Sequence, residues 1–382
     1  MDGVTPAKVT PVPMLDFSRQ FATIREEVLA AVETVLTSQR FILGPEVESF
    51  ERSAALSCGV PHAIGCASGT DALWLAMAAA GVGPGDAVVT SPFSFFATVS
   101  SILRCGARPV LADIDPQTFN LSPQTVGELL RGGETIKAVL PVHLYGQCAD
   151  WDAFSTLREE FGVTLVEDAA QAFGAEWRGV KAGALGASAA FSFYPTKNLA
   201  AVGDAGLVTT SSESIDERVR SLRAHGMKRR YYHDEVGWNS RLDTIQAAVL
   251  EVKLKYLPEG NRKRRALAAG YAEMFAAAGL TGKGIVLPFE DSRGTHVYHQ
   301  YVIRAPKRDA LRAFLAERKI GTEVYYPLSL HQQVSLVDLG YKTGDFPESE
   351  RAAEEVLALP MYPELRSDEQ EIVVGAIAEF FR

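Results

Sequence analysis

Between about Gly65 and Thr210, short apolar runs alternate with segments of helical periodicity, and this alternation limits the possible folds most strongly. The runs are apolar almost throughout, which is typical of parallel strands that are buried on both faces. Strands separated by helices form βαβ units with right-handed crossovers, so we expect a mostly parallel sheet. The expected strands are Ala87–Thr90, Pro109–Asp113, Ala138–Val142, Thr164–Glu167, Ala189–Phe193 and Gly206–Thr210.

The segments before this region and after it predict the domain organisation. Residues 1–12 are expected to form a flexible N-terminal arm, and the apolar spacing from Phe17 to Val35 predicts an amphipathic helix. A second helical stretch, from Leu242 to about Phe275, contains Pro258. We place a boundary there, between a large domain (13–257) and a small C-terminal domain (258–382). Pro258 is also compatible with a kink in one long helix.

The C-terminal region is predicted to be a mixture of helices and strands. Its expected strand is Val297–Ala305, and its expected helices are Arg308–Arg318, Ala352–Leu359 and Asp368–Arg382. The predicted class is therefore α/β, with a large sheet domain and a smaller α+β domain.

The composition excludes several classes of protein. With 47% hydrophobic and 22% charged residues, the chain of 382 residues has the composition of a globular protein rather than a disordered one. A net charge of −9 argues against general nucleic-acid binding, and the longest apolar stretch, Ala72–Val82, is too short for a bilayer. Four cysteines without paired spacing, and no secretory leader, predict a cytoplasmic protein. The seven histidines have no metal-ligand spacing, so no metal site is expected.

One cluster of small residues is a candidate anion site. Ser68-Gly69-Thr70 opens an alanine-rich helix, whose first N–H groups and dipole attract a phosphate. Gly69 would let the phosphate approach the backbone closely. The alternative is an ordinary helix cap, in which the hydroxyl of Ser68 or Thr70 binds the first turn.

Three further clusters carry charged or aromatic side chains near the ends of expected strands. Asp168 ends an apolar strand, where a protonated ring nitrogen would stabilise it; the alternative is that it caps the next helix. Lys197 follows an aromatic strand, where burial would disfavour its charged form; the alternative is an exposed loop lysine. Phe95 belongs to an aromatic segment that would otherwise be plain core. A phosphate site, a carboxylate, an amine and an aromatic face together predict a site for pyridoxal 5′-phosphate.

At these residues the chain resembles the DegT/DnrJ/EryC1/StrS family of sugar aminotransferases. The resemblance covers nearly the whole chain, and it implies the three-layer fold of fold-type I pyridoxal-phosphate transferases. The segments that carry it are Phe41–Val47, Ser68–Thr70, Glu167–Gln171, Ser192–Asn198, Gly237–Asp243 and Tyr325–His331.

The resemblance implies a role for each matching residue. Lys197 would bond covalently to the cofactor and then move protons, Asp168 would pair with the pyridine nitrogen, and Phe95 would stack on the ring. The remaining cofactor contacts would be Ser68, Gly69, Thr70 and Ser192 at the phosphate, Gln171 beside the ring, and Asn239 at the phosphate of the neighbouring subunit. The last contact implies a homodimer with shared active sites. The substrate contacts would be Arg229, Arg241, Tyr326 and His331.

The implied reaction moves an amino group from L-glutamate, giving 2-oxoglutarate, to a nucleoside-diphosphate-linked keto-sugar in amino-sugar biosynthesis. The Gly237–Arg241 and Tyr298–Tyr301 segments favour amination at C3 over C4. A basic loop that includes Arg223, Arg229 and Arg230 is a candidate for the pyrophosphate, or else a solvated loop. Another fold-type I reaction (a sugar dehydratase or an amino-acid aminotransferase) and a non-catalytic regulatory protein remain alternatives. Dehydratases of the family carry histidine where this chain has Lys197, which favours transamination.

Overall fold

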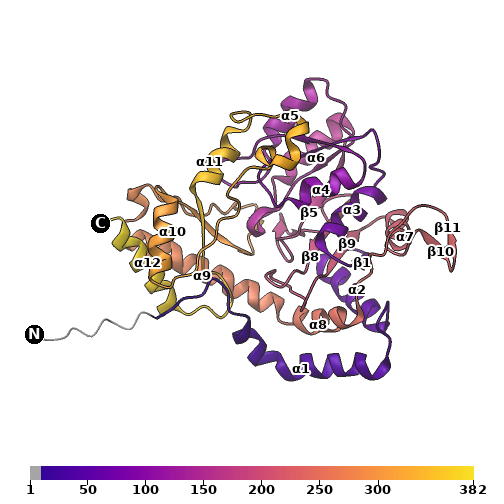
Figure 1. The fold of residues 1–382 in the computed structure, drawn as a ribbon, viewed down its shortest axis with the longest axis horizontal. Helices are drawn as coiled ribbons and strands as arrows, with labels where there is room; N and C mark the ends of the chain where they lie inside the picture. The colour runs from indigo at the N-terminus through magenta and orange to yellow at the C-terminus, as the bar shows by residue number, and fades with distance from the viewer. Residues whose placement is uncertain (1–9) are drawn as a thin grey trace, which may run out of the picture.

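The computed structural model describes residues 10–382, and its centre is a seven-stranded sheet with the order β1-β9-β8-β5-β4-β2-β3 (Figure 1). The strands are β1 (His62–Cys66), β2 (Ala87–Thr90), β3 (Arg108–Leu111), β4 (Ala138–Leu140), β5 (Thr164–Asp168), β8 (Ser188–Ser192) and β9 (Gly206–Thr210). The expected mostly parallel sheet is confirmed, and each of the six expected strands lies within two residues of its predicted bounds.

Strand β9 differs from the prediction, because it runs antiparallel to both β8 and β1. All five of its residues are buried, so its apolar pattern is the same as that of a parallel strand. The chain between Ser192 and Gly206 contains no helix, and antiparallel neighbours need only a turn between them. Strand β1 was not predicted at all.

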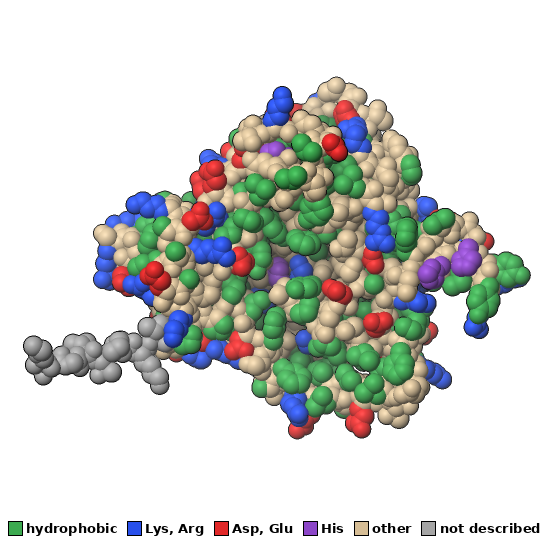
Figure 2. All heavy atoms as spheres, viewed as in Figure 1, with side chains coloured by type: hydrophobic (Ala, Val, Ile, Leu, Met, Phe, Trp, Pro, Cys, Tyr) green, Lys and Arg blue, Asp and Glu red, His purple; other side chains and the backbone are tan. Residues whose placement is uncertain are grey.

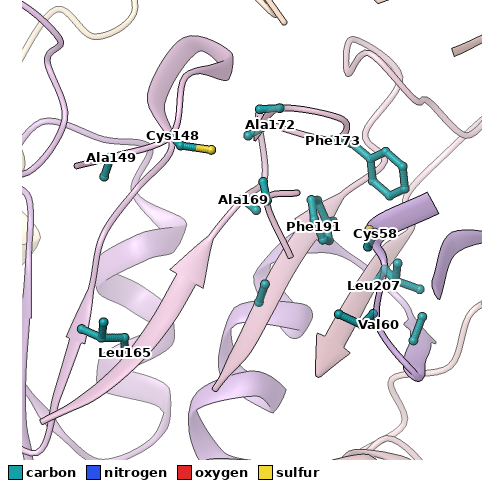
Figure 3. Close-up of a cluster of buried hydrophobic side chains, with 14 of the residues drawn as sticks. Cys58, Val60, Cys148, Ala149, Leu165, Ala169, Ala172, Phe173, Phe191 and Leu207 are labelled. Carbon is teal, nitrogen blue, oxygen red and sulfur yellow. The ribbon is translucent and has the colours of Figure 1, made fainter. Parts of the chain in front are cut away.

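Helices cover both faces of the sheet and give three layers. One face is covered by α3 (Gly69–Ala79), α4 (Ala97–Arg104) and α7 (Glu213–Leu222). The other is covered by α2 (Pro45–Cys58), α5 (Pro123–Arg131), α6 (Trp151–Phe161) and α8 (Thr244–Leu254). Figure 3 shows part of the second core, in which Cys58 of α2 lies near Phe191 of β8 and Leu207 of β9. The fold class predicted from the sequence is confirmed.

Helix α1 (Phe17–Ser38) lies outside these layers and packs along α8 (Figure 1). Their contact consists of Ile24, Val28, Val249 and Val252, all buried. The predicted amphipathic helix is therefore confirmed. Among the helices of residues 10–382, none is both long and apolar enough to cross a membrane.

The C-terminal region packs around a two-stranded antiparallel sheet, in a core that it shares with earlier residues such as Phe93 and Val142. Its elements are α9 (Leu257–Ala277), β13 (Tyr301–Arg304), α10 (Arg308–Glu317), α11 (Pro347–Glu355), β14 (Val356–Leu359) and α12 (Ser367–Phe380). The shorter elements of the described part of the chain are η1 (Leu144–Gly146), β6 (Glu176–Trp177), β7 (Val180–Lys181), β10 (Met227–Arg229), β11 (Tyr232–His233), η2 (Thr281–Lys283), β12 (Gly294–Thr295), η3 (Leu330–Gln332) and η4 (Val334–Leu339).

Two predictions for this region need correction. The expected helix Ala352–Leu359 ends at Glu355, and the next four residues form β14. Val-Leu-Ala-Leu is apolar on every side, and periodicity cannot assign such a short run to a helix or a strand. The expected strand Val297–Ala305 is shortened to Tyr301–Arg304.

The structure also bears on the two ends of the predicted large domain. Helix α8 ends at Leu254 and Pro258 lies in the first turn of α9, so the helical stretch is interrupted just before the proposed boundary. The division into 13–257 and 258–382 stays a prediction.

Residues 1–9 of the expected arm lie outside the described residues. Val12 is buried and bonded through its backbone to Lys319 and Gly321, so the arm prediction is wrong at its last residue.

A glycine contact at the start of β9 predicts a stability effect. A Cβ atom on Gly206 would lie 2.2 Å from the carbonyl oxygen of Ser68, which precedes α3. We expect Gly206→Ala to lower the free energy of unfolding by about 1–3 kcal/mol or more, measured by urea denaturation. Gly83→Ala is the matched control, because nothing lies within 4 Å of its new Cβ atom. Equal losses in the two variants would contradict the close contact.

Candidate active site

The carboxyl ends of several central strands open into one cavity of about 670 Å³. Ligands of α/β folds bind at this edge of the sheet. The predicted residues that line the cavity are Ser68, Gly69, Thr70, Phe95, Asp168, Gln171, Ser192, Lys197 and Tyr326. They come from strand ends, a helix start and loops spread over more than 250 positions of the sequence, and the fold brings them together.

The two acids at the end of β5 point in opposite directions. Leu165 and Val166 belong to the cores on the two faces of the sheet, so successive side chains of β5 alternate between them. Glu167 is fully buried and accepts hydrogen bonds from the N–H groups of Gly183 (2.7 Å), Leu185 (2.9 Å) and Gly186 (2.8 Å). Glu167 is therefore a structural carboxylate, outside the cavity lining.

His143 completes the environment of Glu167. Its Nδ1 accepts a hydrogen bond from the N–H of Ala149 at 3.1 Å, so the ring proton is on Nε2. That proton is donated to Oε2 of Glu167 at 3.0 Å. The arrangement connects β5 to the segment after β4.

Asp168 faces the cavity and is held by uncharged donors. Its Oδ2 accepts a hydrogen bond from the hydroxyl of Thr98 at 2.8 Å, and Thr98 in turn lies 2.8 Å from the hydroxyl of Ser94. Its Oδ1 accepts a weaker bond from the N–H of Ala170 at 3.3 Å. Burial raises the pKa of Asp168, and these hydrogen bonds oppose that rise only in part. A cation facing this carboxylate would be strongly favoured.

Lys197 lies in a closed turn between β8 and β9. Its N–H donates to the carbonyl of Tyr194 at 2.8 Å, and the N–H of Ala201 donates to the carbonyl of Phe193 at 2.8 Å. Burial lowers the pKa of Lys197 to about 8, and the charge of Asp168 opposes the shift. A substantial fraction of the amine is therefore neutral near pH 8, unlike that of an exposed lysine.

The first turn of α3 forms a tight cradle at one side of the cavity. A Cβ atom on Gly69 would lie 2.5 Å from the Cβ of Ser192, so only glycine fits there. The hydroxyl of Ser68 accepts a hydrogen bond from the N–H of Asp71 at 3.1 Å and is thus the helix cap. The first N–H groups of a helix have no partner within it, and they favour an anion.

An acid in this first turn would repel an anion unless it were neutralised. Asp71 forms an ion pair with Arg104 and accepts a hydrogen bond from the hydroxyl of Ser240 at 2.7 Å. Arg104 lies over the ring of Trp74, 4.4 Å from its centroid. The charge of Asp71 is thus balanced by its own partner.

Gln171 and two aromatic residues line the opposite side. Gln171 accepts a hydrogen bond from the N–H of Tyr145 at 2.6 Å and donates one to the hydroxyl of Tyr326 at 3.2 Å. The ring centroids of Phe95 and Tyr326 are 6.2 Å apart. Phe95 is 59% exposed, so one face of its ring is free to contact a ligand.

The structure does not bring all predicted residues to this cavity. Asn239 and Arg241 line a second hollow of about 270 Å³, which shares Asp204 with the first. His331 is buried elsewhere, with its Nε2 2.9 Å from a carboxylate oxygen of Glu350. It is not among the residues that line either hollow.

Arg229 lies on the β10–β11 hairpin, which projects from the body of the molecule (Figures 1 and 2). Its guanidinium is 3.6 Å from the ring centroid of Tyr232, and both side chains are exposed. Arg223, which the sequence grouped with this basic loop, is instead buried and bonded to Glu51 (2.6 Å). Arg223 is therefore a structural residue, and its assignment to a pyrophosphate site is wrong.

Thr98 and His299 are among the cavity residues that the sequence did not single out as site residues. Thr98 holds Asp168, and the only sequence signal was its position in the polar and aromatic segment after β2. His299 lines the cavity next to the lysine turn, about a hundred positions from it in the sequence. No local pattern could have connected it with Lys197.

Comparison with known proteins identifies the family. A model of the DegT/DnrJ/EryC1/StrS aminotransferase family matches residues 22–378. This chain belongs to that family. The expected resemblance is thus confirmed, and the protein is a pyridoxal-phosphate-dependent aminotransferase.

Relatives and solved structures of the family match the chain over nearly its full length. A "Pleiotropic regulatory protein" of Geobacillus stearothermophilus is 49% identical, over 97% of this chain and 99% of its own. The "UDP-2-acetamido-2-deoxy-3-oxo-D-glucuronate aminotransferase" of Pseudomonas aeruginosa is 39% identical, over 96% and 99%. The solved structure of DesV from Streptomyces venezuelae, in complex with a ketimine intermediate, has a TM-score of 0.93 with 39% identity, over 97% and 99%.

The cofactor of the family fits the observed cavity. Another solved structure, NtdA of Bacillus subtilis, is described with bound PMP and superposes with a TM-score of 0.89 at 30% identity, over 98% of this chain and 86% of its own. In this chain the glycine cradle suits a phosphate, the buried Asp168 suits a protonated ring nitrogen, and the Lys197 amine suits an aldehyde.

The different roles of Glu167 and Asp168 predict different losses of stability when each acid is replaced by its amide. In Glu167→Gln, the new NH₂ group would face backbone N–H donors in a buried site, and neither group could then form a hydrogen bond. We therefore expect the free energy of unfolding to fall by about 3–5 kcal/mol. Asp168→Asn should cost much less, because its partners are one hydroxyl and one weak backbone donor. Urea denaturation of both variants would test this order, and a reversed order would contradict it.

Asp168 also predicts a change in the titration of Lys197. Its negative charge raises the pKa of the lysine, so Asp168→Asn should move that pKa further below about 8. The measurement is the pH dependence of acetylation of Lys197 in the cofactor-free protein, followed by mass spectrometry. An unchanged midpoint would show that the two groups do not interact, and an upward shift would contradict the expected sign of the interaction.

Proposed function

We propose that this aminotransferase moves an amino group from L-glutamate to a nucleoside-diphosphate-linked keto-sugar, with C3 favoured over C4, in amino-sugar biosynthesis. The observation that carries the proposal is a single cavity in which an amine with a lowered pKa, a buried carboxylate and a glycine cradle meet. The sugar substrate is supported by the names of relatives, several of which act on 3-oxo or 3-amino sugars.

The residues of this chain have complementary tasks in such a reaction. Pyridoxal phosphate, when bound, supplies an electron sink for a carbon that loses its proton. Lys197 is suited to take and return that proton, because an amine with a pKa near 8 exists in both forms close to neutral pH. Asp168 would keep a cationic ring nitrogen charged, and the N–H groups of Gly69 and Thr70 would hold the phosphate.

The second hollow supports the proposed sharing of sites between two subunits. Asn239 is exposed and lies outside the main cavity, as expected of a residue that serves a neighbouring copy. Arg241 lines the same hollow and would suit a phosphate or carboxylate. Tyr326 is the candidate sugar contact inside the main cavity.

A regulatory protein is the second candidate, because the relative at 49% identity has that name. The observed site favours catalysis over binding alone. A lysine with a lowered pKa beside a buried acid is the arrangement that proton transfer at the cofactor needs, and groups with shifted pKa values gather at catalytic sites. The other fold-type I candidates, a sugar dehydratase and an amino-acid aminotransferase, differ from this proposal in the substrates on which they act.

The decisive test is spectroscopic. Glutamate added to the cofactor-loaded protein should convert the absorbance of bound pyridoxal phosphate to that of the amine form. A nucleotide-linked 3-keto-sugar should then restore the first spectrum. Among keto acids only 2-oxoglutarate should do so, because it reverses the glutamate half-reaction, whereas pyruvate should not. Lys197→Ala should lose both changes, together with borohydride-trappable cofactor. Restoration by keto acids but not by any nucleotide-linked keto-sugar would indicate an amino-acid aminotransferase, and no response to glutamate would contradict the proposed donor.

Shared sites predict a particular result for mixed subunits. Lys197→Ala and Asn239→Ala homodimers should each be nearly inactive, the first because it lacks the amine and the second because it lacks a phosphate contact. Hybrid dimers would contain one intact site and should regain activity, up to about half that of the wild type per hybrid. Activity of unfolded and refolded mixtures measures this, and no recovery would argue against a contact between subunits.

A further inference from the structure

Asn198, which directly follows Lys197, connects the lysine turn to another part of the molecule. Its Nδ2 donates to Oδ1 of Asn261 at 2.9 Å and to the carbonyl of Val297 at 3.1 Å. Its Oδ1 lies 3.2 Å from Nδ1 of His299. The amide of Asn198 is therefore bonded on both its nitrogen and its oxygen.

The bond to His299 has a defined direction. The amide oxygen of Asn198 is an acceptor, so Nδ1 of His299 carries the proton and donates it. Burial lowers the pKa of His299 well below its usual range, and the nearby charges of Lys197 and Arg264 add to this effect. The ring is thus neutral and has one N–H, which it gives to Asn198.

Helix α9 fixes two of the three partners of Asn198, which are Asn261 and His299. Asn261 is 8% exposed and anchors its own Nδ2 on the carbonyl of Phe173 at 3.2 Å. Arg264, one helical turn further, is buried and donates to the carbonyls of Tyr298 (3.1 Å), His299 (3.4 Å) and Met361 (2.9 Å). The segment that carries His299 is therefore fixed in place by the buried guanidinium of Arg264.

These contacts bear on the chemistry of the site because Lys197 is only one residue away. The turn itself is closed by the backbone bonds of Lys197 and Ala201, which fix its shape but not its position over the cavity. The charge of Asp168 acts on Lys197. The other titratable groups around the cavity are His299, Tyr194, Asp204, Glu323, Tyr325 and Tyr326.

We infer that Asn198 and His299 are positioning residues, which hold the Lys197 turn against helix α9 and so keep the lysine amine half-buried at the wall of the cavity. Loss of either partner would free the turn to move outward. The amine would then be more exposed to water, and its charged form would be less disfavoured. The inference rests on Lys197 as the reacting amine and does not depend on which sugar is the substrate.

Three variants separate positioning from simple stabilisation. Asn198→Ala removes the whole amide, and His299→Leu removes the donor at similar volume. His299→Asn is the conservative variant, because its Nδ2 lies where Nδ1 of the ring was and still donates. Gln370→Leu is the matched control: it removes a buried amide whose Nε2 donates to the carbonyl of Leu267 in α9 at 2.8 Å, away from the cavity.

The first readout is the pH at the midpoint of Lys197 acetylation in the cofactor-free protein. The melting temperature of each variant is measured in parallel. We expect Asn198→Ala and His299→Leu to raise the midpoint by about one pH unit toward the ordinary lysine value. His299→Asn should keep the wild-type midpoint. Gln370→Leu should lower the melting temperature and leave the midpoint unchanged.

A second readout uses the cofactor-loaded protein. With glutamate as donor, Asn198→Ala and His299→Leu should slow the maximal rate of the absorbance change about tenfold or more, without changing the half-saturating glutamate concentration. His299→Asn should recover most of the rate.

The inference is overturned if Asn198→Ala and His299→Leu melt earlier but keep the wild-type midpoint, or if His299→Asn behaves like His299→Leu. Should Asn198→Ala fail to fold, the pair of His299 variants decides alone. If the wild-type protein transfers no amino group to any nucleotide-linked keto-sugar while the midpoints shift as described, the proposed function fails and the positioning role stands.

Discussion

Asp168 is a buried carboxylate held only by uncharged hydrogen-bond donors, and the rest of the active site depends on this constraint. A carboxylate in such a position is costly, since burial favours its protonated form. The hydroxyls of Ser94 and Thr98 reduce the cost but do not cancel it. A cationic ring nitrogen beside Asp168 would form an ion pair with it. The chain thus supplies the negative partner of that pair before the cofactor binds. Lys197 faces the same cavity, and its own charge is disfavoured by burial.

The architecture explains how these groups reach one edge of the sheet. Asp168 ends a parallel strand, Ser68 follows β1, and Ser192 ends β8, so all three arrive at carboxyl ends. The reversed direction of β9 lets the chain turn back directly after β8, and that turn carries Lys197. The glycines at positions 69 and 206 then allow α3 to begin against β8 and β9 without a gap.

The sequence predicted the parts of this structure that depend on local pattern. Continuous apolar runs located six of the buried strands. Asp168 and Lys197 were recognised because each ends or follows such a run, and Ser68 because it opens an alanine-rich helix. The direction of β9 was not predictable, since a strand that is buried on both faces has the same composition in either orientation. The run Val356–Leu359 was assigned to a helix for a similar reason, because four consecutive apolar residues have no period. The roles of Glu167, Arg223 and His299 depend on partners distant in the chain, and only the folded structure shows them.

The carboxylate of Asp71 connects two regions that otherwise have separate tasks. It lies in the first turn of α3, at the phosphate cradle, and it also holds the hydroxyl of Ser240, between Asn239 and Arg241. A displacement of the segment around Ser240 would therefore disturb the start of α3. In the dimer proposed above, cofactor retention and subunit association would then be thermodynamically linked, so that dilution of the protein would favour loss of the vitamin, and addition of the vitamin would favour assembly.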